Sequence, residues 1–227
     1  MGTQYNPAIV TGGLVLALDA ANIKSYPGTG TAWTDLSSAR NNGTLTNGPT
    51  YSSANGGSIL FDGSNDYAQK NSLTMDLSAG VSMEMIFKSS NITSVAQGLM
   101  QFNLFISSYY INFYANGSGA LRWEVFSPYP TSGSQIFTPT SLSNDTWYHA
   151  VGTYASGVSI LYINGNSVAS GSNGTGNFPS SYTTDLSVGV YAGYFSGNIA
   201  IAKMYNRALS SVEVKQNFNA IRGRYSI

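Results

Sequence analysis

The sequence offers few residues for catalysis. Its 227 residues include no cysteine and a single histidine, His149, so thiol chemistry and a zinc site built from two histidines are excluded. A catalytic histidine needs a nucleophile and an orienting acid around it, and no nucleophile-elbow motif of the form G-x-S-x-G is present. We therefore predict that the protein is not an enzyme and that His149 is a hydrogen-bonded residue of a central strand.

Hard oxygen ligands gather in one short segment. Asp62, Asn65 and Asp66 carry side-chain oxygens at close spacing, and such oxygens suit Ca²⁺. The segment does not match an EF-hand, because Leu73 stands where the bidentate glutamate should be. Asp and Asn are also favoured in tight turns, where their side chains bind the nearby backbone. A calcium site and a turn without metal are therefore both open, and no cofactor is required.

An aromatic run offers a different chemistry. Alternation along a strand would place Tyr110, Asn112 and Tyr114 on one face, and Trp123 follows in the next apolar run. Aromatic rings beside polar groups suit carbohydrate and protein interfaces alike. Tyrosine is also common in β-strands that have no binding role, because it packs well on a sheet. The run is therefore either a glycan-stacking surface or ordinary strand sequence.

Short strands are the elements that would position these residues. Asn-Gly pairs, which are typical of tight hairpin turns, occur along the whole chain. Apolar runs of strand length lie between them, as in 81–88, where every second residue is apolar. The other runs are 13–19, 58–62, 99–106, 109–115, 120–126, 147–154, 158–164, 186–191 and 198–205. This pattern predicts an all-β antiparallel sandwich with Phe61, Phe87 and Trp147 in its core.

One helix is predicted at 210–221. The segment begins with a capping box, in which a serine precedes a glutamate by three residues. Val214, Phe218 and Ile221 then fall on one apolar stripe that would lie on the sandwich. We expect a single domain from residue 13 to residue 227 that includes this helix.

The two ends of the chain are predicted to attach the protein to a partner. Residues 1–12 would form an arm whose apolar side chains have no core of their own, and the other end is basic. An arm that orders on binding lays apolar groups along a partner's surface, whereas a frayed terminus is the alternative. The candidate attachment residues are Tyr5, Ile9, Val10, Arg222 and Arg224.

Charge and hydropathy argue against two classes of partner. Ten Lys and Arg residues balance ten Asp and Glu residues, so the chain lacks the excess of cations that binds nucleic acid. No run reaches the roughly 18 apolar residues of a membrane span. The first residues also lack the basic and apolar stretches of a secretory signal.

Three segments together resemble the laminin G-like, concanavalin A-like jelly-roll family. Residues 59–67 resemble the family's FDG-x-x-DY strand and turn. Residues 147–165 resemble its W-x-H-x-x-x-T-Y and LY-x-NG hairpin, and residues 197–210 resemble its closing G-x-I and YNRALS segment. The resemblance covers residues 14 to about 221. It implies an antiparallel jelly-roll sandwich and, as in many members, calcium bound at a loop rim.

The same resemblance raises glycoside hydrolysis, because glucanases share this fold. Such enzymes need two carboxylates beside the scissile bond, which the glucanases of this fold typically carry as E-x-D-x-x-E on one strand. Neither Glu84 nor Glu124 begins this pattern. A catalytic pair assembled from Glu84 and Glu124 on neighbouring strands is the less favoured alternative.

A narrower resemblance concerns the kind of particle that carries such domains. Residues 14–22, 33–37 and 41–45 resemble standalone domains of this family in virion proteins of tailed bacteriophages. This implies a non-catalytic capsid decoration or fibre component on an extracellular particle, held by other virion proteins. A homotrimer is expected, because phage fibres and capsid three-fold positions have that symmetry. The alternative is a carbohydrate-binding adhesin or lectin module that recognises a host surface glycan.

Overall fold

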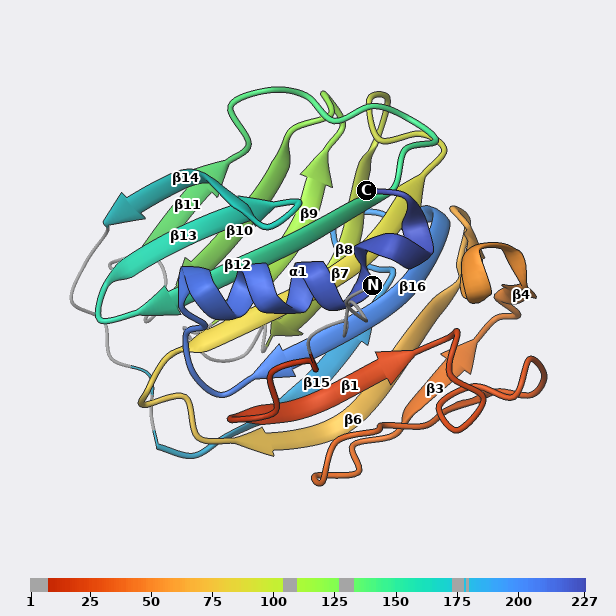
Figure 1. Cartoon of the computed structure of the whole chain (residues 1–227), viewed down its shortest axis with the longest axis horizontal. Helices are drawn as coiled ribbons and strands as arrows, with labels where there is room; N and C mark the ends of the chain where they lie inside the picture. Colours follow the sequence, from red (N-terminus) through yellow and green to blue (C-terminus); the bar gives the residue numbers. More distant parts are fainter. Residues whose placement is uncertain (1–7, 104–109, 127–132, 173–177, 179) are drawn as a thin grey trace, which may run out of the picture.

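Two antiparallel β-sheets pack face to face, with one helix on the outside (Figure 1). The computed structural model describes residues 8–103, 110–126, 133–172, 178 and 180–227. The prediction of an all-β antiparallel sandwich with one C-terminal helix is confirmed. Within the described residues, no helix is long and apolar enough to cross a membrane.

Sheet A carries the helix on its outer face. Its strands are β1 (Leu14–Asp19), β4 (Thr50–Ser52), β5 (Ser58–Asp62), β7 (Val81–Ser89), β12 (Tyr148–Ala155), β13 (Val158–Ile163), β14 (Asn166–Ser172) and β16 (Ser196–Tyr205). Their order is β14-β13-β12-β7-β16-β5-β4, and β1 pairs with β16. A short 3₁₀ helix, η1 (Ala54–Gly56), connects β4 to β5.

Sheet B forms the other layer. Its strands are β2 (Ala32–Trp33), β3 (Gly43–Thr46), β6 (Tyr67–Met75), β8 (Ala96–Asn103), β9 (Tyr110–Asn116), β10 (Leu121–Phe126), β11 (Gly133–Phe137) and β15 (Tyr182–Val188). Their order is β11-β10-β9-β8-β15-β6-β3-β2. Strands that are distant in sequence, such as β15 and β6, therefore lie side by side.

The core lies between the two sheets. Phe61 and Phe87 are buried there as predicted, and Phe195 packs edge-on against both rings. Trp147 is not part of this core. It lies outside sheet A against Tyr225 of the helix. Side chains alternate between the two faces of a strand, and Trp147 is two residues before His149, which faces the helix.

Helix α1 (Ser211–Tyr225) begins as predicted. The Ser210 hydroxyl accepts a hydrogen bond from the Glu213 amide, and the Glu213 carboxylate accepts one from the Ser210 amide. The helix runs beyond the predicted end at residue 221, because Tyr225 is buried against sheet A and Arg224 forms an ion pair with Asp19. The apolar stripe of Val214, Phe218 and Ile221 is buried as expected.

Close contact between the sheets at Gly152 gives a first prediction. A Cβ at this position would lie 2.3 Å from Cδ2 of the buried Trp123. We expect Gly152→Ala to lower the free energy of unfolding by about 1–3 kcal/mol, because overpacking displaces side chains or backbone. Gly223→Ala is the matched control, since no atom lies within 4 Å of its Cβ. In the helix this change should raise the free energy of unfolding by up to about 1 kcal/mol. Denaturant unfolding checks both variants, and equal effects would contradict the prediction.

Candidate functional site

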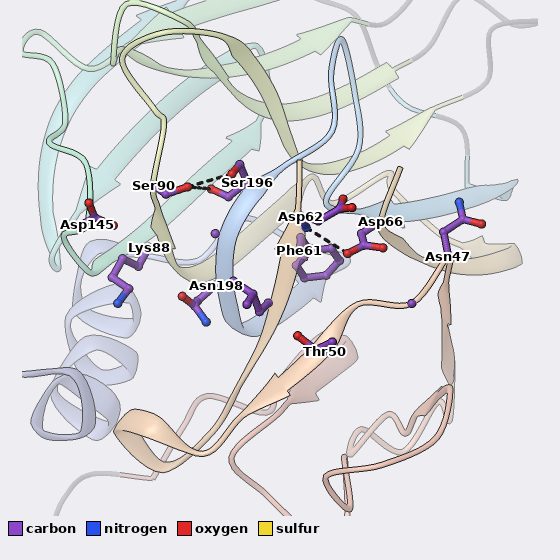
Figure 2. Close-up of a pocket in the computed structure, with 13 residues that line it drawn as sticks. Asn47, Thr50, Phe61, Asp62, Asp66, Lys88, Ser90, Asp145, Ser196 and Asn198 are labelled. Atoms are coloured by element: carbon purple, nitrogen blue, oxygen red, sulfur yellow. Dashed lines mark hydrogen bonds between the residues drawn. The ribbon is translucent and has the colours of Figure 1, made fainter. Parts of the chain in front are cut away.

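A cavity of about 490 Å³ opens on the rim of the sandwich, beside β5, β7 and β16 (Figure 2). We call it the rim cavity. Most of its lining side chains are polar. They are Asn47, Thr50, Asp62, Asp66, Lys88, Ser90, Asp145, Ser196 and Asn198, beside the apolar Leu60 and Phe61.

Strand register builds the floor of this cavity. Asn198 of β16 pairs with Leu60 of β5 on one side and with Lys88 of β7 on the other. Leu60 in turn pairs with Thr50 of β4. Because directly paired residues share a face of a sheet, these four side chains form a row across the outer face of sheet A. The row has no signal in the sequence, because its members come from four separate segments.

One wall is the turn between β5 and β6. Asp62 Oδ1 accepts hydrogen bonds from the backbone amides of Ser64 and Asn65, at 2.8 and 3.3 Å. Asp66 Oδ2 accepts one from the Asp62 amide at 3.0 Å. The Ser64 side chain and the Asp66 backbone also interact with the Asp62 carboxylate, whereas Asp66 Oδ1 makes no hydrogen bond to a residue in the described part of the chain. The two aspartates thus shape the turn and keep acceptor capacity for the cavity.

The pKa values of these two carboxyls shift in opposite directions. The backbone amide of Ser64 holds the pKa of Asp62 below its ordinary value. Burial raises the pKa of Asp66, and the negative charge of Asp62 acts in the same direction. The turn therefore concentrates negative charge on one side of the rim cavity.

The opposite wall carries Lys88 and Asp145 (Figure 2). The Asp145 amide donates to the Ser89 carbonyl at 2.8 Å, which fixes the loop before β12. Its exposed side chain has no hydrogen bond to any of the residues described. The Lys88 ammonium lies 5.5 Å from the ring centroid of Trp147. The backbone of Asp145 and the ammonium of Lys88 are therefore positioned at the wall by neighbours from other segments, and the Asp145 carboxylate faces solvent.

The predicted calcium ligands adopt the geometry of a tight turn. Asp62 and Asp66 line the rim cavity, whereas Asn65 does not and offers its carbonyl to Asn47 instead. Among the residues that the structure describes, no group of three or more His, Cys, Asp or Glu could hold a metal ion. Calcium binding at Asp62, Asn65 and Asp66 stays a prediction.

The predicted stacking residues do not form one exposed surface. Tyr110, Asn112 and Tyr114 share the outer face of sheet B, as their alternation indicated. Trp123 points the other way, into the core, and both Trp123 and Asn112 are 0% exposed. The hydroxyl of Tyr114 donates to Glu124 Oε1 at 3.1 Å. Strand alternation is the reason that Trp123 cannot join the other three.

The two candidate catalytic glutamates lie in different sheets. Glu84 is on β7 in sheet A, beneath helix α1, and Glu124 is on β10 in sheet B, where Arg122 binds it at 2.8 Å. The alternative of a pair on neighbouring strands is therefore wrong. Glu124 is bound by residues of sheet B, and Glu84 is bound by residues of sheet A and of helix α1.

Glu84 is the centre of a buried polar network. Its Oε1 accepts a hydrogen bond from Lys203 Nζ at 3.1 Å and lies 3.1 Å from His149 Nε2. Its Oε2 accepts one from Asn217 Nδ2 at 2.7 Å and lies 3.3 Å from the Tyr205 hydroxyl. His149 is thus a buried, hydrogen-bonded residue of β12, as predicted. Burial acts to raise the pKa of Glu84, but Lys203 and His149 hold it down at about 2.

The arm is bound to the domain from residue 8 onward. Asn217 Oδ1 accepts a hydrogen bond from the Val10 amide at 2.7 Å, and Gln216 Nε2 donates to the Ala8 carbonyl at 2.6 Å. Val10 itself is buried beside Tyr205. The expectation that Val10 contacts a partner is therefore wrong, because its apolar surface is already covered. Ile9 is half-buried.

The structure describes two of the three remaining predicted attachment residues. Tyr5 lies outside the described residues. Arg224 forms two hydrogen bonds with the Asp19 carboxylate, at 2.8 and 2.9 Å, and its side chain stays 33% exposed, so its role in attachment stays a prediction. Arg222 is exposed and lies over the Phe218 ring. Ile9 and Arg222 stay predicted contact residues.

Residues 62–215 match the laminin G-type family described as the concanavalin A-like lectin/glucanases superfamily. The chain belongs to this family. A search of curated protein sequences gives no match.

Solved structures with the same fold include binding domains of several proteins. Domain 4 of the extracellular arabinanase of Geobacillus stearothermophilus, solved with arabinotriose, has a TM-score of 0.71 at 17% identity over 92% of this chain and 99% of that domain. The binding domain of Paraclostridial mosquitocidal protein 1 has a TM-score of 0.68 at 17% identity over 92% of this chain. Trypanosoma rangeli sialidase has a TM-score of 0.66 at 16% sequence identity over 95% of this chain. The chain spans 52% of the toxin domain and 34% of the sialidase, and these likenesses show the fold alone.

The Glu84 network gives a prediction for this concanavalin A-like domain. We expect Glu84→Gln to lower the free energy of unfolding at neutral pH by about 3–5 kcal/mol, because Lys203 would be left buried without its anion. The pKa of Glu84 falls from 4.5 to about 2 on folding. The carboxylate therefore stabilises the fold fully above pH 4.5, and this contribution is lost as the pH falls toward 2.

Denaturant unfolding between pH 7 and pH 2 tests this dependence. The parent protein should lose stability more steeply below pH 4.5 than the Glu84→Gln variant does. Asp145→Asn, at an exposed carboxyl, controls for the removal of one negative charge. Parallel curves for the parent protein and Glu84→Gln would disprove the role assigned to Glu84.

Proposed function

We propose that the protein is a non-catalytic carbohydrate-binding module and that the rim cavity is its glycan site. The observation that carries this proposal is a cavity of about 490 Å³ lined by carboxylates, amides and hydroxyls that the described residues leave partly unbonded. This volume lies within the range of ligand pockets, roughly 300–1,000 Å³. A sugar ring presents hydroxyls that both donate and accept, so it matches such a lining.

The chemistry of individual groups supports a sugar. Asn198 donates to Ser58 Oγ through Nδ2, which leaves its carbonyl oxygen to accept from a ligand. Thr50 and Asp145 add a hydroxyl and a carboxylate without hydrogen bonds inside the described residues. Leu60, 42% exposed, offers an apolar surface for the C–H face of a sugar. The arabinanase domain solved with arabinotriose supports the same class of ligand by analogy of fold.

The non-catalytic part of the proposal rests on how the carboxylates of the cavity are placed. The three aspartates of the lining are divided between two walls, with Asp145 opposite Asp62 and Asp66 (Figure 2). In Asp62 and in Asp66, one carboxylate oxygen accepts a hydrogen bond from a backbone amide of the turn. The groups at the cavity are thus suited to hold a glycan rather than to attack it.

Membership of a virion is a second proposal, which is compatible with the first. The opening segments of the chain resemble those of domains in tailed-bacteriophage virion proteins. A capsid decoration or fibre component on the particle surface, as a trimer bound to other virion proteins, would place a glycan site in contact with a host.

Glycan binding is testable with variants of the cavity. An array of neutral and charged oligosaccharides identifies the best-bound glycan, and titration calorimetry measures its affinity. We expect Asp145→Ala combined with Asn198→Ala to weaken this affinity about tenfold or more, because a hydrogen bond to a charged group contributes about 1.5–3 kcal/mol. Gln135→Ala, at an exposed residue of sheet B, is the control and should bind like the parent.

The same samples test the absence of catalysis. The best-bound glycan should remain intact after long incubation with the protein, as measured by mass spectrometry. Cleavage of the glycan would contradict a non-catalytic role. Affinity that is unchanged in the double variant would remove the rim cavity as the site.

A further inference from the structure

We propose that the rim cavity selects glycans that carry a free, protonated amino group over neutral and acidic glycans. The inference rests on the proposed function and adds the chemical class of the ligand. It follows from the balance of charges around the cavity and from the acceptors that remain free there.

Negative charge outweighs positive charge at this site. Asp62, Asp66 and Asp145 line the cavity, against a single cation from the described residues, Lys88. The Lys88 ammonium is also drawn toward the Trp147 ring, 5.5 Å from its centroid. Figure 2 shows Lys88 on the wall opposite Asp62 and Asp66. A cationic ligand group therefore meets attraction at the turn, and a carboxylate meets repulsion.

The geometry of the turn favours an ammonium group in particular. Asp66 Oδ2 accepts from the Asp62 amide, which leaves Asp66 Oδ1 for a ligand. The Asp62 carboxylate lies beside it in the exposed turn, where Ser64, Asn65 and Asp66 bind it without neutralising its charge. Asp66 is only 4% exposed, and the negative charge of Asp62 lies beside it. A positive charge placed against both carboxylates would relieve their mutual repulsion. An ammonium has three donors, which suit carboxylate oxygens from two neighbouring aspartates.

A divalent cation fits these groups less well than an ammonium does. Ca²⁺ takes about six to eight oxygen ligands, whereas the described residues hold no cluster of three acidic, His or Cys residues suited to a metal. Asp145, the third carboxylate, stands on the opposite wall (Figure 2). The neutral groups of Thr50 and Asn198 between the walls match sugar hydroxyls. An amino sugar supplies both the cation and the hydroxyls.

The test compares three oligosaccharides that differ in charge. The probes are a tetramer of glucosamine, its fully N-acetylated counterpart and an acidic tetramer of a uronic acid. We expect the parent protein to bind the glucosamine tetramer at least about tenfold more tightly than either of the others, since N-acetylation removes the charge. Titration calorimetry at near-neutral pH and low salt measures the three affinities.

Variants connect this preference to the turn. Asp62→Asn combined with Asp66→Asn keeps oxygens that can accept the backbone hydrogen bonds but removes both charges. This variant should lose the tenfold preference and keep its binding of the N-acetylated tetramer. Asp76→Asn, at an exposed aspartate outside the cavity, is the matched control and should keep the preference. Circular dichroism and denaturant unfolding confirm that both variants are folded.

Each outcome separates this inference from the proposed function. Equal affinity for the glucosamine and N-acetylated tetramers would overturn the selection while leaving the glycan site intact. Failure to bind any carbohydrate would overturn both. Displacement of the glucosamine tetramer by millimolar CaCl₂ in the parent, but not by NaCl of equal ionic strength, would assign the turn to a divalent cation and overturn the selection.

Discussion

The buried carboxylate of Glu84 is the interaction on which the outer layer of this molecule depends. An ionised carboxylate without partners is costly in an interior of low dielectric constant. Lys203 from β16, His149 from β12 and Asn217 from α1 therefore converge on it. This convergence fixes three strands in register and places the helix over them. Through Asn217 it also fixes the chain at Val10.

Contacts connect helix α1 to the wall of the rim cavity. Asn217 holds the middle of α1 on sheet A, and the last turn then brings Tyr225 against Trp147, with ring centroids 4.9 Å apart. Trp147 in turn lies beneath the Lys88 ammonium at the cavity wall. The charge on that wall is thus positioned by a chain of contacts that begins at Glu84.

The parts of the fold that sequence could predict are those encoded by local pattern. Strand β7 follows the alternation of 81–88, and the capping box marks the start of α1. Strands β6 and β14 have no such signal, because their exposed positions carry small or polar residues and no apolar run forms. The prediction that Trp147 lies in the core is wrong, since hydrophobicity alone does not distinguish the core from the surface beneath a helix.

The candidate site likewise has one part that local sequence pattern predicts and one part that it does not. The turn from Asp62 to Asp66 was visible in the sequence, because its side chains bind backbone only two to four residues away. The row of Leu60, Asn198 and Lys88 was not visible, because pairing between strands far apart in sequence creates it. Sequence pattern therefore identified one wall of the cavity and none of its floor.

The rim also has a physical advantage as a place for recognition. Asn198 and Lys88 stand on paired strands, so the backbone positions from which these side chains extend are fixed before any ligand arrives. A site organised in advance loses less conformational entropy on binding than one that must be ordered. The Asp62 amide likewise holds Asp66 in position. Because the sheet and not the side chains maintains this geometry, substitutions at the rim can change which glycan is bound while the fold stays the same.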